Sequence, residues 1–125
     1  MAKVRAAYEA FTSGDIDEFV ALLAHDFVSQ QSAAVPWRGS YRGPQGVREL
    51  FSRVAEHATA SFEPEDFIDG GDRVVVVGRA QLIPQTTGQA FNVRELHVWH
   101  VHDARLQAMD VFLNAPVELL VALGA

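Results

Sequence analysis

The sequence predicts an α+β domain in which helices gather on one face of a curved sheet. Its first half carries apolar residues at helical spacing. Its second half is rich in β-branched residues and broken by short turn signals, as expected for neighbouring antiparallel strands. A chain of 125 residues can bury one core, and no linker or repeat divides it, so we expect a single domain over residues 1–125.

The charge balance is acidic. Sixteen Asp and Glu residues against ten Lys and Arg residues give a net charge of −6, and the basic residues form no cluster. A polyanion such as nucleic acid is therefore not an expected partner. The chain lacks cysteine, which excludes disulfides, a thiolate nucleophile and a zinc site built from cysteines.

No stretch of the chain is predicted to enter a membrane. Apolar runs such as residues 74–77 are far too short to span one, and the N-terminus begins directly with an amphipathic pattern rather than a signal peptide. We therefore expect no membrane partner and a cytoplasmic location.

Two helices are expected to open the chain. Apolar residues at positions 4, 7, 8 and 11 form the stripe of the first helix, and Ser13-Gly14 suits its end. Asp15 then has the position of an N-cap, with Glu18 three residues later. The apolar stripe of this second helix continues to Leu23.

A short strand over residues 27–31 and an irregular loop over residues 35–44 are expected to separate the second helix from a third. Pro36 and three further Gly or Pro residues indicate the loop. Pro44 also suits the first turn of the third helix, whose apolar stripe runs from Val47 to Ala58.

The second half of the chain predicts strands over residues 61–68, 73–82, 91–102 and 106–114. Pro64 places the first of them at an edge of the sheet, because proline cannot donate to the ladder. Pro116 opens a short C-terminal helix, which we expect Asn114 to cap.

The strand over residues 91–102 carries the most informative pattern. Its odd positions place Glu95, His97 and Trp99 on one side, and its even positions place Leu96 and Val98 on the other. One side thus gathers a carboxylate, an imidazole and an indole. If that side faces an enclosed space, it forms a binding site.

Both faces of the predicted sheet contain apolar residues. A sheet with one solvated face alternates apolar with polar residues, and these strands do not. If helices cover one face, the other still carries more apolar surface than a monomer usually exposes. We therefore predict a homodimer packed through the outer face of the sheet.

Six motifs in order resemble the SnoaL-like branch, related to ketosteroid isomerases, of the nuclear transport factor 2-like superfamily. They are SGDID followed by LLAHDF, YRGPQGVRELF, GDRVVVVGR, TTGQAF, HVWHVHDARL and VFLN. The resemblance spans essentially the whole chain. It implies a cone-shaped, cystatin-like α+β barrel, in which a curved antiparallel or mixed sheet wraps around the N-terminal helices. It also implies an apolar pocket at the open end and a dimer.

Proteins of this superfamily include cyclases, isomerases, epoxide hydrolases and dehydratases as well as binding proteins without chemistry, so the fold alone assigns no function. In the ketosteroid isomerase pattern, the base falls on Gln31, which cannot accept a proton in that role. The oxyanion-hole tyrosine falls near Ala7, with Tyr8 one residue away, and the second donor falls on His97. The isomerase mechanism needs carboxyl groups at two of these places.

Two other catalytic patterns are also incomplete. The limonene epoxide hydrolase pattern places its arginine at Arg79 but its two aspartates at Gln81 and Val111. The SnoaL-type cyclase pattern places its histidine at His97 and its aspartate again at Val111. Asp110 lies one residue away and would point to the opposite face. A β-bulge that turns Asp110 into the pocket is the open alternative.

The candidate catalytic residues are His97, Glu95 and Arg79. His97 is the expected acid or base near neutral pH. Glu95 either supports His97 or forms an ion pair with Arg79 across the neighbouring strand. The expected ligand-binding residues, which provide flat apolar walls or orienting amides, are Trp99, Trp37, Gln31, Gln81, Tyr8, Met109, Val111 and Leu113. Of these, Trp37 is expected at the rim because it lies in the predicted loop.

Two functions remain open at this stage. The first is an enzyme of the cyclase, isomerase or dehydratase type that acts without a cofactor on a small hydrophobic carbonyl compound resembling a polyketide, steroid or terpenoid. The second is a non-catalytic ligand-binding protein or structural homodimer. No metal site is predicted, because the other histidines are not spaced as ligands on one element.

Overall fold

The computed structural model describes residues 1–124 and forms one α+β unit. Its elements are α1 (Ala2–Thr12), α2 (Ile16–Ala21), β1 (Leu23–Gln31), β2 (Gly39–Arg42), α3 (Gly43–His57), β3 (Ala58–Asp69), β4 (Arg73–Pro84), β5 (Phe91–His102), β6 (Arg105–Leu113) and α4 (Val117–Leu123). The strands form one six-stranded sheet in the order β2-β1-β6-β5-β4-β3. Only β1 and β6 run parallel, so the sheet is mixed.

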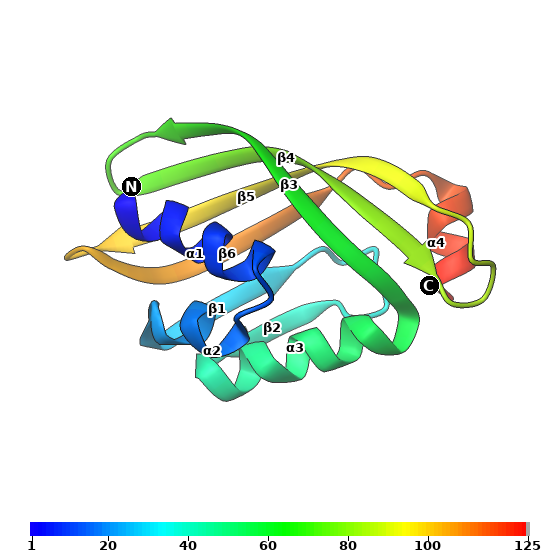
Figure 1. Cartoon of the computed structure of the whole chain (residues 1–125), viewed down its shortest axis with the longest axis horizontal. Helices are drawn as coiled ribbons and strands as arrows, with labels where there is room; N and C mark the ends of the chain where they lie inside the picture. Colours follow the sequence, from blue (N-terminus) through cyan, green and yellow to red (C-terminus); the bar gives the residue numbers. More distant parts are fainter. Residues whose placement is uncertain (125) are drawn as a thin grey trace.

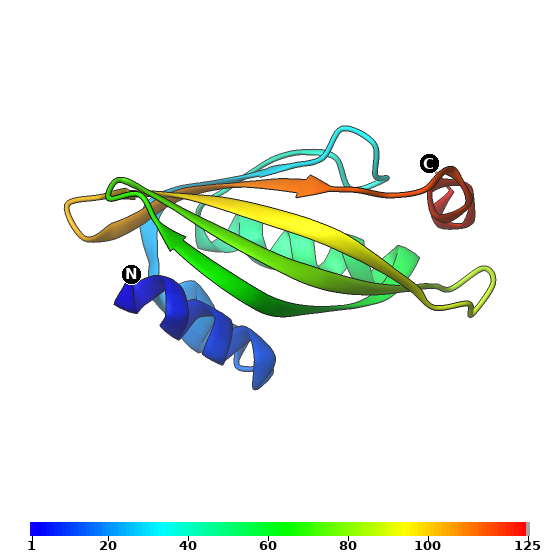
Figure 2. The same cartoon turned by 90° about the horizontal axis from the view of Figure 1, so that it is seen from above.

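The sheet is strongly bent, and α1, α2 and α3 pack against its concave side (Figures 1 and 2). Helix α3 contacts β1, β2 and β3, and therefore lies between the two edge strands of the open sheet. Helix α4 lies at the end of the molecule away from α1 (Figure 1). This arrangement confirms the predicted curved sheet wrapped around helices and leaves the barrel incompletely closed.

The start of the chain follows the predicted helix signals closely. Ser13 is the C-cap of α1, Gly14 follows with a φ of 77°, and the Asp15 carboxylate accepts a hydrogen bond of 3.0 Å from the backbone N–H of Glu18. Helix α2 is shorter than predicted. Leu23 begins β1 instead of ending the helix, because it pairs with Leu106 of β6.

The predicted irregular loop over residues 35–44 is wrong in its second half. Residues 39–42 form β2, which pairs antiparallel with residues 28–31 of β1. Gly39 enters this strand with a φ of 114°, a conformation that glycine adopts without a steric penalty. Pro44 does stand in the first turn of α3, as its position predicts.

The strands of the second half occur in the predicted order. β3 is an edge strand, and its pairing with β4 shifts between Pro64 and Asp66, next to the proline. β3 extends over residues 58–69 rather than 61–68. The predicted cap of the last helix is wrong: Pro116 is the N-cap, and the backbone N–H of Asn114 instead donates to the carbonyl of Arg94.

The core consists of two clusters of buried side chains on the concave side. The first lies beneath α1 and α2 and includes Tyr8, Phe27 and Trp99. The second lies toward α4 and includes Trp37 and Leu119. Within residues 1–124, no helix is long and apolar enough to span a membrane.

Candidate acid–base cavity

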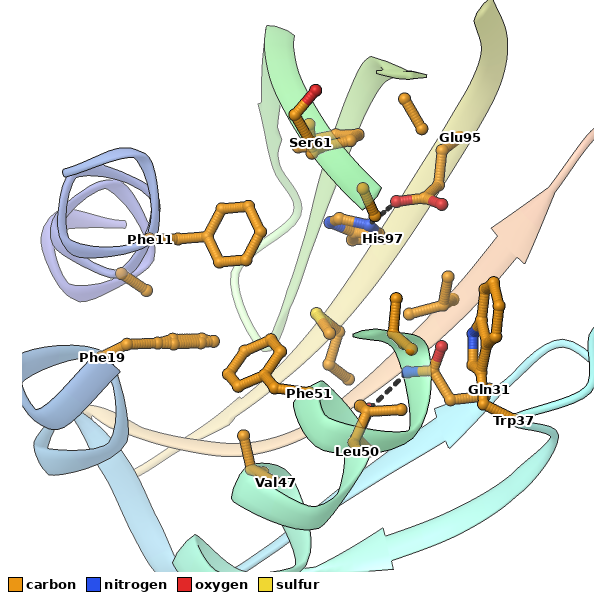
Figure 3. A pocket seen from close by; sticks show the side chains of 18 of the residues that line it. Phe11, Phe19, Gln31, Trp37, Val47, Leu50, Phe51, Ser61, Glu95 and His97 are labelled. Carbon is orange, nitrogen blue, oxygen red and sulfur yellow. Dashed lines mark hydrogen bonds and ion pairs between the residues drawn. The ribbon is translucent and has the colours of Figure 1, made fainter. Parts of the chain in front are cut away.

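A cavity of about 420 Å³ lies where the two core clusters meet. Its size is within the range of small-molecule sites. Phe11, Phe19 and Phe51 form an aromatic wall on the helix side, whereas Glu95 and His97 project from β5 (Figure 3). The lining residues that are exposed lie at the end of α3 and the start of β3, so the cavity opens there; they are Ala55, Thr59, Ala60 and Ser61.

Four side chains form a continuous hydrogen-bonded chain along the cavity wall. The indole Nε1 of Trp99 donates to the hydroxyl oxygen of Tyr8 over 2.8 Å. That hydroxyl lies 2.5 Å from Nδ1 of His97, and Nε2 of His97 lies 2.6 Å from Oε2 of Glu95. Glu95, His97 and Trp99 occupy every second position of β5, and all three line the cavity. This confirms that the odd positions of the strand share the concave face.

Simple donor and acceptor rules set the direction of each bond. An indole N–H can only donate and a carboxylate can only accept, so Trp99 donates to the Tyr8 oxygen and the Nε2–H of His97 donates to Glu95. In the tautomer that carries its proton on Nε2, Nδ1 has only a lone pair and accepts from the Tyr8 hydroxyl. Both nitrogens of His97 are thereby occupied.

Glu95 has the oxygen that remains open to a ligand. Its Oε1 has no hydrogen-bond partner among residues 1–124. Every fully enclosed side-chain N or O atom of these residues does have a partner, so Oε1 is at least partly accessible. The side chain is only 16% exposed and lines the cavity. The site therefore presents a carboxylate that is fixed at Oε2 and accessible at Oε1.

Burial determines which protons of these four hydrogen-bonded side chains can move. Loss of water around the Tyr8 hydroxyl raises the pKa of Tyr8 well above its ordinary value of 10.0, a shift that the nearby Glu95 charge increases and the Trp99 hydrogen bond opposes. Tyr8 consequently keeps its proton. Proton exchange with a ligand is thus confined to Glu95 and His97, at one end of the series of hydrogen bonds.

Phe62 of β3 covers the imidazole. The ring centroids of Phe62 and His97 are 4.3 Å apart. Gly78 makes this packing possible, because a Cβ at Gly78 would lie only 2.2 Å from Cζ of Phe62. The sequence reasoning missed Phe62, which it treated as part of a plain edge strand.

A second polar group lies on β1. The side-chain amide of Gln31 donates to the hydroxyl of Ser29 over 2.8 Å, and both residues line the cavity. Gln30 points outward to Ser40. The sequence reasoning missed Ser29, although the two-residue period of a strand places it on the same face as Gln31.

Most predicted pocket residues line the cavity: Tyr8, Gln31, Trp37, Glu95, His97, Trp99, Met109 and Val111. Trp37 is not the rim residue that its predicted loop suggested. It is only 6% exposed and packs within the second core cluster. The hydroxyl of Tyr41 donates to the backbone carbonyl of Trp37, which holds this part of the chain in place.

Arg79 and Gln81 do not belong to the cavity, and the predicted ion pair between Arg79 and Glu95 is wrong. In β4 the buried residues are at even positions, so Arg79 and Gln81 lie on the outer face. Nε of Arg79 lies 3.7 Å from a carboxylate oxygen of Glu65. The residue opposite Glu95 in β4 is Gly78.

Asp110 points to the outer face, as its position one residue from Val111 predicts, and the alternative of a β-bulge that turns it inward is wrong. Asp110 pairs in register with Val98, an outward position of β5, and its carboxylate lies 2.8 Å from Nε2 of His100. The register shift between β5 and β6 falls between His100 and Val101, too far along to rotate Asp110 inward.

Leu113 was expected in the pocket floor but does not line the cavity. It packs against the second core cluster. It also borders a separate hollow of about 360 Å³ near the ends of β1 and β6, and Gln31 and Val111 border both spaces.

The described part of the chain, residues 1–124, contains no group of three or more His, Asp or Glu side chains placed to hold a metal ion. The polar groups of the cavity are instead a carboxylate, an imidazole, hydroxyls, two indole N–H groups and one amide. These groups suit hydrogen bonding and proton transfer on an apolar compound.

Comparison with known proteins agrees with this architecture. The family model of the SnoaL-like domain matches residues 4–109. A nuclear transport factor 2-like protein from Burkholderia thailandensis is 30% identical, with 97% of this chain and 92% of that chain covered and a TM-score of 0.86. A nuclear transport factor 2-like protein of unknown function from Burkholderia pseudomallei is 25% identical, with 100% and 97% covered and a TM-score of 0.88.

TerC, co-crystallised with polyporic acid, shares the fold at 21% identity, with 99% of this chain and 97% of that chain covered and a TM-score of 0.86. No curated protein sequence matches the chain. The match over residues 4–109 covers most of the chain, and the chain therefore belongs to the SnoaL-like domain family and has its nuclear transport factor 2-like fold.

Proposed function

We propose that the chain binds a small, ring-shaped hydrophobic carbonyl compound in this cavity and moves a proton on it, as a cyclase, isomerase or dehydratase does. The observation that carries the proposal is the carboxylate of the lining residue Glu95, which is fixed by His97 at one oxygen and has no partner at the other. An ionisable pair in an otherwise aromatic and aliphatic cavity costs desolvation energy, which a purely structural core would avoid.

Glu95 Oε1 is the proposed base. It removes a proton from a carbon next to the ligand carbonyl and becomes a carboxylic acid; the C–H electron pair forms the C=C bond of an enolate, and the carbonyl π pair moves onto the oxygen. His97 keeps its Nε2–H on Oε2 and stabilises the carboxylate in the correct orientation. This step uses only the protein's own side chains and needs no cofactor.

The Gln31 amide is the proposed partner of the ligand oxygen. One of its N–H groups donates to Ser29, so the second remains for the carbonyl. Gln31 stands at the place of the carboxylate base in the isomerase pattern, and its amide can orient but not deprotonate. In this proposal the base is therefore on β5 and the orienting group is on β1.

Deuterium exchange tests this function directly. β-Tetralone, a neutral ring ketone with an acidic C–H next to its carbonyl, would be incubated with the protein in D₂O and followed by proton NMR. The proposal predicts exchange faster than in buffer alone, lost in Glu95→Gln and retained in Glu65→Gln, a control on the outer face. Saturable binding of β-tetralone without exchange would favour the alternative, a non-catalytic binding protein.

The outer face of the sheet is the proposed contact with a second copy. Leu96 and Phe112 are cross-strand neighbours there and are 37% and 55% exposed. Val77 of β4 lies opposite Leu96 and extends this row of apolar side chains. Ile68 of β3 lies in the adjacent row and is 49% exposed. A continuous apolar surface of this kind favours association, and a two-fold axis would let the same patch cover itself.

A further inference from the structure

We propose that the ligand of the cavity carries no negative charge and that the group facing Oε1 of Glu95 is a proton donor. The inference rests on the proposed function and names the class of compound that the site accepts: ring-shaped molecules that bring to Oε1 an acidic C–H beside a carbonyl, a hydroxyl, another neutral donor or an ammonium group. Carboxylates and phosphates of the same shape are excluded.

The charge of the lining supports this selection. Among the described residues, 1–124, no Lys or Arg side chain lines the cavity, and Glu95 is the one Asp or Glu that does. His97 offers no free donor to an anion, because its Nδ1 faces the Tyr8 hydroxyl and its Nε2 faces Glu95. The lining therefore presents one carboxylate and no Lys or Arg side chain that could pair with a negatively charged ligand.

Arginines near the cavity have other contacts. Arg79 approaches Glu65 on the outer face, and Arg53 donates to Glu49 on the surface of α3. The guanidinium of Arg5 stacks over Phe67 at 4.2 Å from the ring centroid. None of them belongs to the lining, so none is in position to neutralise an anionic ligand.

The hydrogen-bonding groups around Glu95 and His97 also favour a ligand that donates a hydrogen bond. The protons of Trp99, Tyr8 and His97 are all used within the chain of hydrogen bonds, which leaves no donor there for a ligand carboxylate. Oε1 of Glu95 is the open group, and it accepts only. The amide and hydroxyl of Gln31 and Ser29 can donate to a ligand, but they bring no positive charge.

Three naphthalenes that carry a hydroxyl, an aminomethyl or a carboxylate group at the same ring position test the inference. Their affinities would be measured at neutral pH by isothermal titration calorimetry. We expect the hydroxyl and ammonium compounds to bind at least about tenfold more tightly than the carboxylate, because like charges in a partly desolvated site repel. In Glu95→Gln the advantage of the ammonium compound disappears, whereas Glu65→Gln leaves it unchanged.

A second variant does not depend on changing the buried network. Ser61 is an exposed lining residue near the mouth, and Ser61→Lys adds a positive charge there. This variant should bind the naphthalene carboxylate more tightly than the wild type does. Equal or tighter binding of the carboxylate by the wild type, or binding of none of the three compounds, would overturn the inference.

The two proposals can fail separately. Correct charge selection without deuterium exchange on β-tetralone would remove the catalytic role and leave the ligand class in place. Exchange that depends on Glu95, together with tight carboxylate binding, would remove the ligand class and leave the catalytic role.

Discussion

The hydroxyl of Tyr8 lies 2.5 Å from Nδ1 of His97 and links the first helix of the chain to its central strand. Trp99 donates to the same hydroxyl and so restricts its rotation. The position of the imidazole proton of His97, and through it the orientation of Glu95, thus depends on Trp99, which lies 91 positions from Tyr8 in the sequence.

The first prediction concerns the tautomer of His97. Nitrogen NMR of the imidazole should show a proton on Nε2, the nitrogen that faces Glu95. In Trp99→Phe the Tyr8 hydroxyl loses the donor that restricts its rotation and can turn its proton away from Nδ1, so the share of the other tautomer should rise. Trp37→Phe removes an indole that also lines the cavity but does not contact this chain of bonds, and it should leave the signals of His97 unchanged. The same tautomer in both variants would refute the role of Trp99.

The second prediction concerns stability. Tyr8→Phe leaves two buried groups without a partner, Nδ1 of His97 and Nε1 of Trp99, whereas Tyr41→Phe leaves only the carbonyl of Trp37. Each unsatisfied group costs about 1–3 kcal/mol, so Tyr8→Phe should lower the free energy of unfolding more than Tyr41→Phe does. Urea unfolding of both variants measures the difference, and a smaller loss for Tyr8→Phe would show that its bonds add little.

The third prediction concerns alkaline pH. Burial raises the pKa of Tyr8 in the folded protein above its ordinary value of 10.0, so the unfolded chain loses this proton first. The free energy of unfolding should therefore be unaffected by this group below pH 10 and should fall above it, by up to about 1.4 kcal/mol per pH unit. The fall should be smaller in Tyr8→Phe. Identical alkaline slopes for the two proteins would contradict a buried, protonated Tyr8.

The fourth prediction concerns the second copy of the chain. Phe112→Glu places a charge in the middle of the apolar outer face and should convert the proposed dimer into a monomer, as measured by analytical ultracentrifugation. Val121→Glu is the matched control, because Val121 is 70% exposed on α4 and lies off the sheet. A wild-type protein that sediments as a monomer at micromolar concentrations would refute the dimer.

Local signals were sufficient to predict much of this fold. The Asp15 cap, the first turn of α3 at Pro44 and the two faces of β5 depend on residues close in sequence, and all three are confirmed. β2 was missed because Pro36 and Gly39 read as loop signals, whereas its pairing with β1 compensates for weak strand propensity.

The site was predictable only in part. Alternation within β5 correctly joined Glu95, His97 and Trp99, but the face of Arg79 depends on how β4 pairs with β5, which no local pattern of the sequence specifies. The contact of Tyr8 with His97 depends on how α1 packs against the sheet, and it spans 89 positions. Such distant contacts required the structure.

Ligand binding in the cavity is the central claim, and the two tryptophans of the chain report on it because both line the cavity. The naphthalene carrying a hydroxyl group would be titrated into the protein labelled with nitrogen-15. We predict that both indole N–H signals shift and saturate together with the backbone signals of Glu95 and His97. Indole signals that stay in place, whether or not Ile68 and Phe112 on the outer face respond, would contradict a ligand site in this cavity.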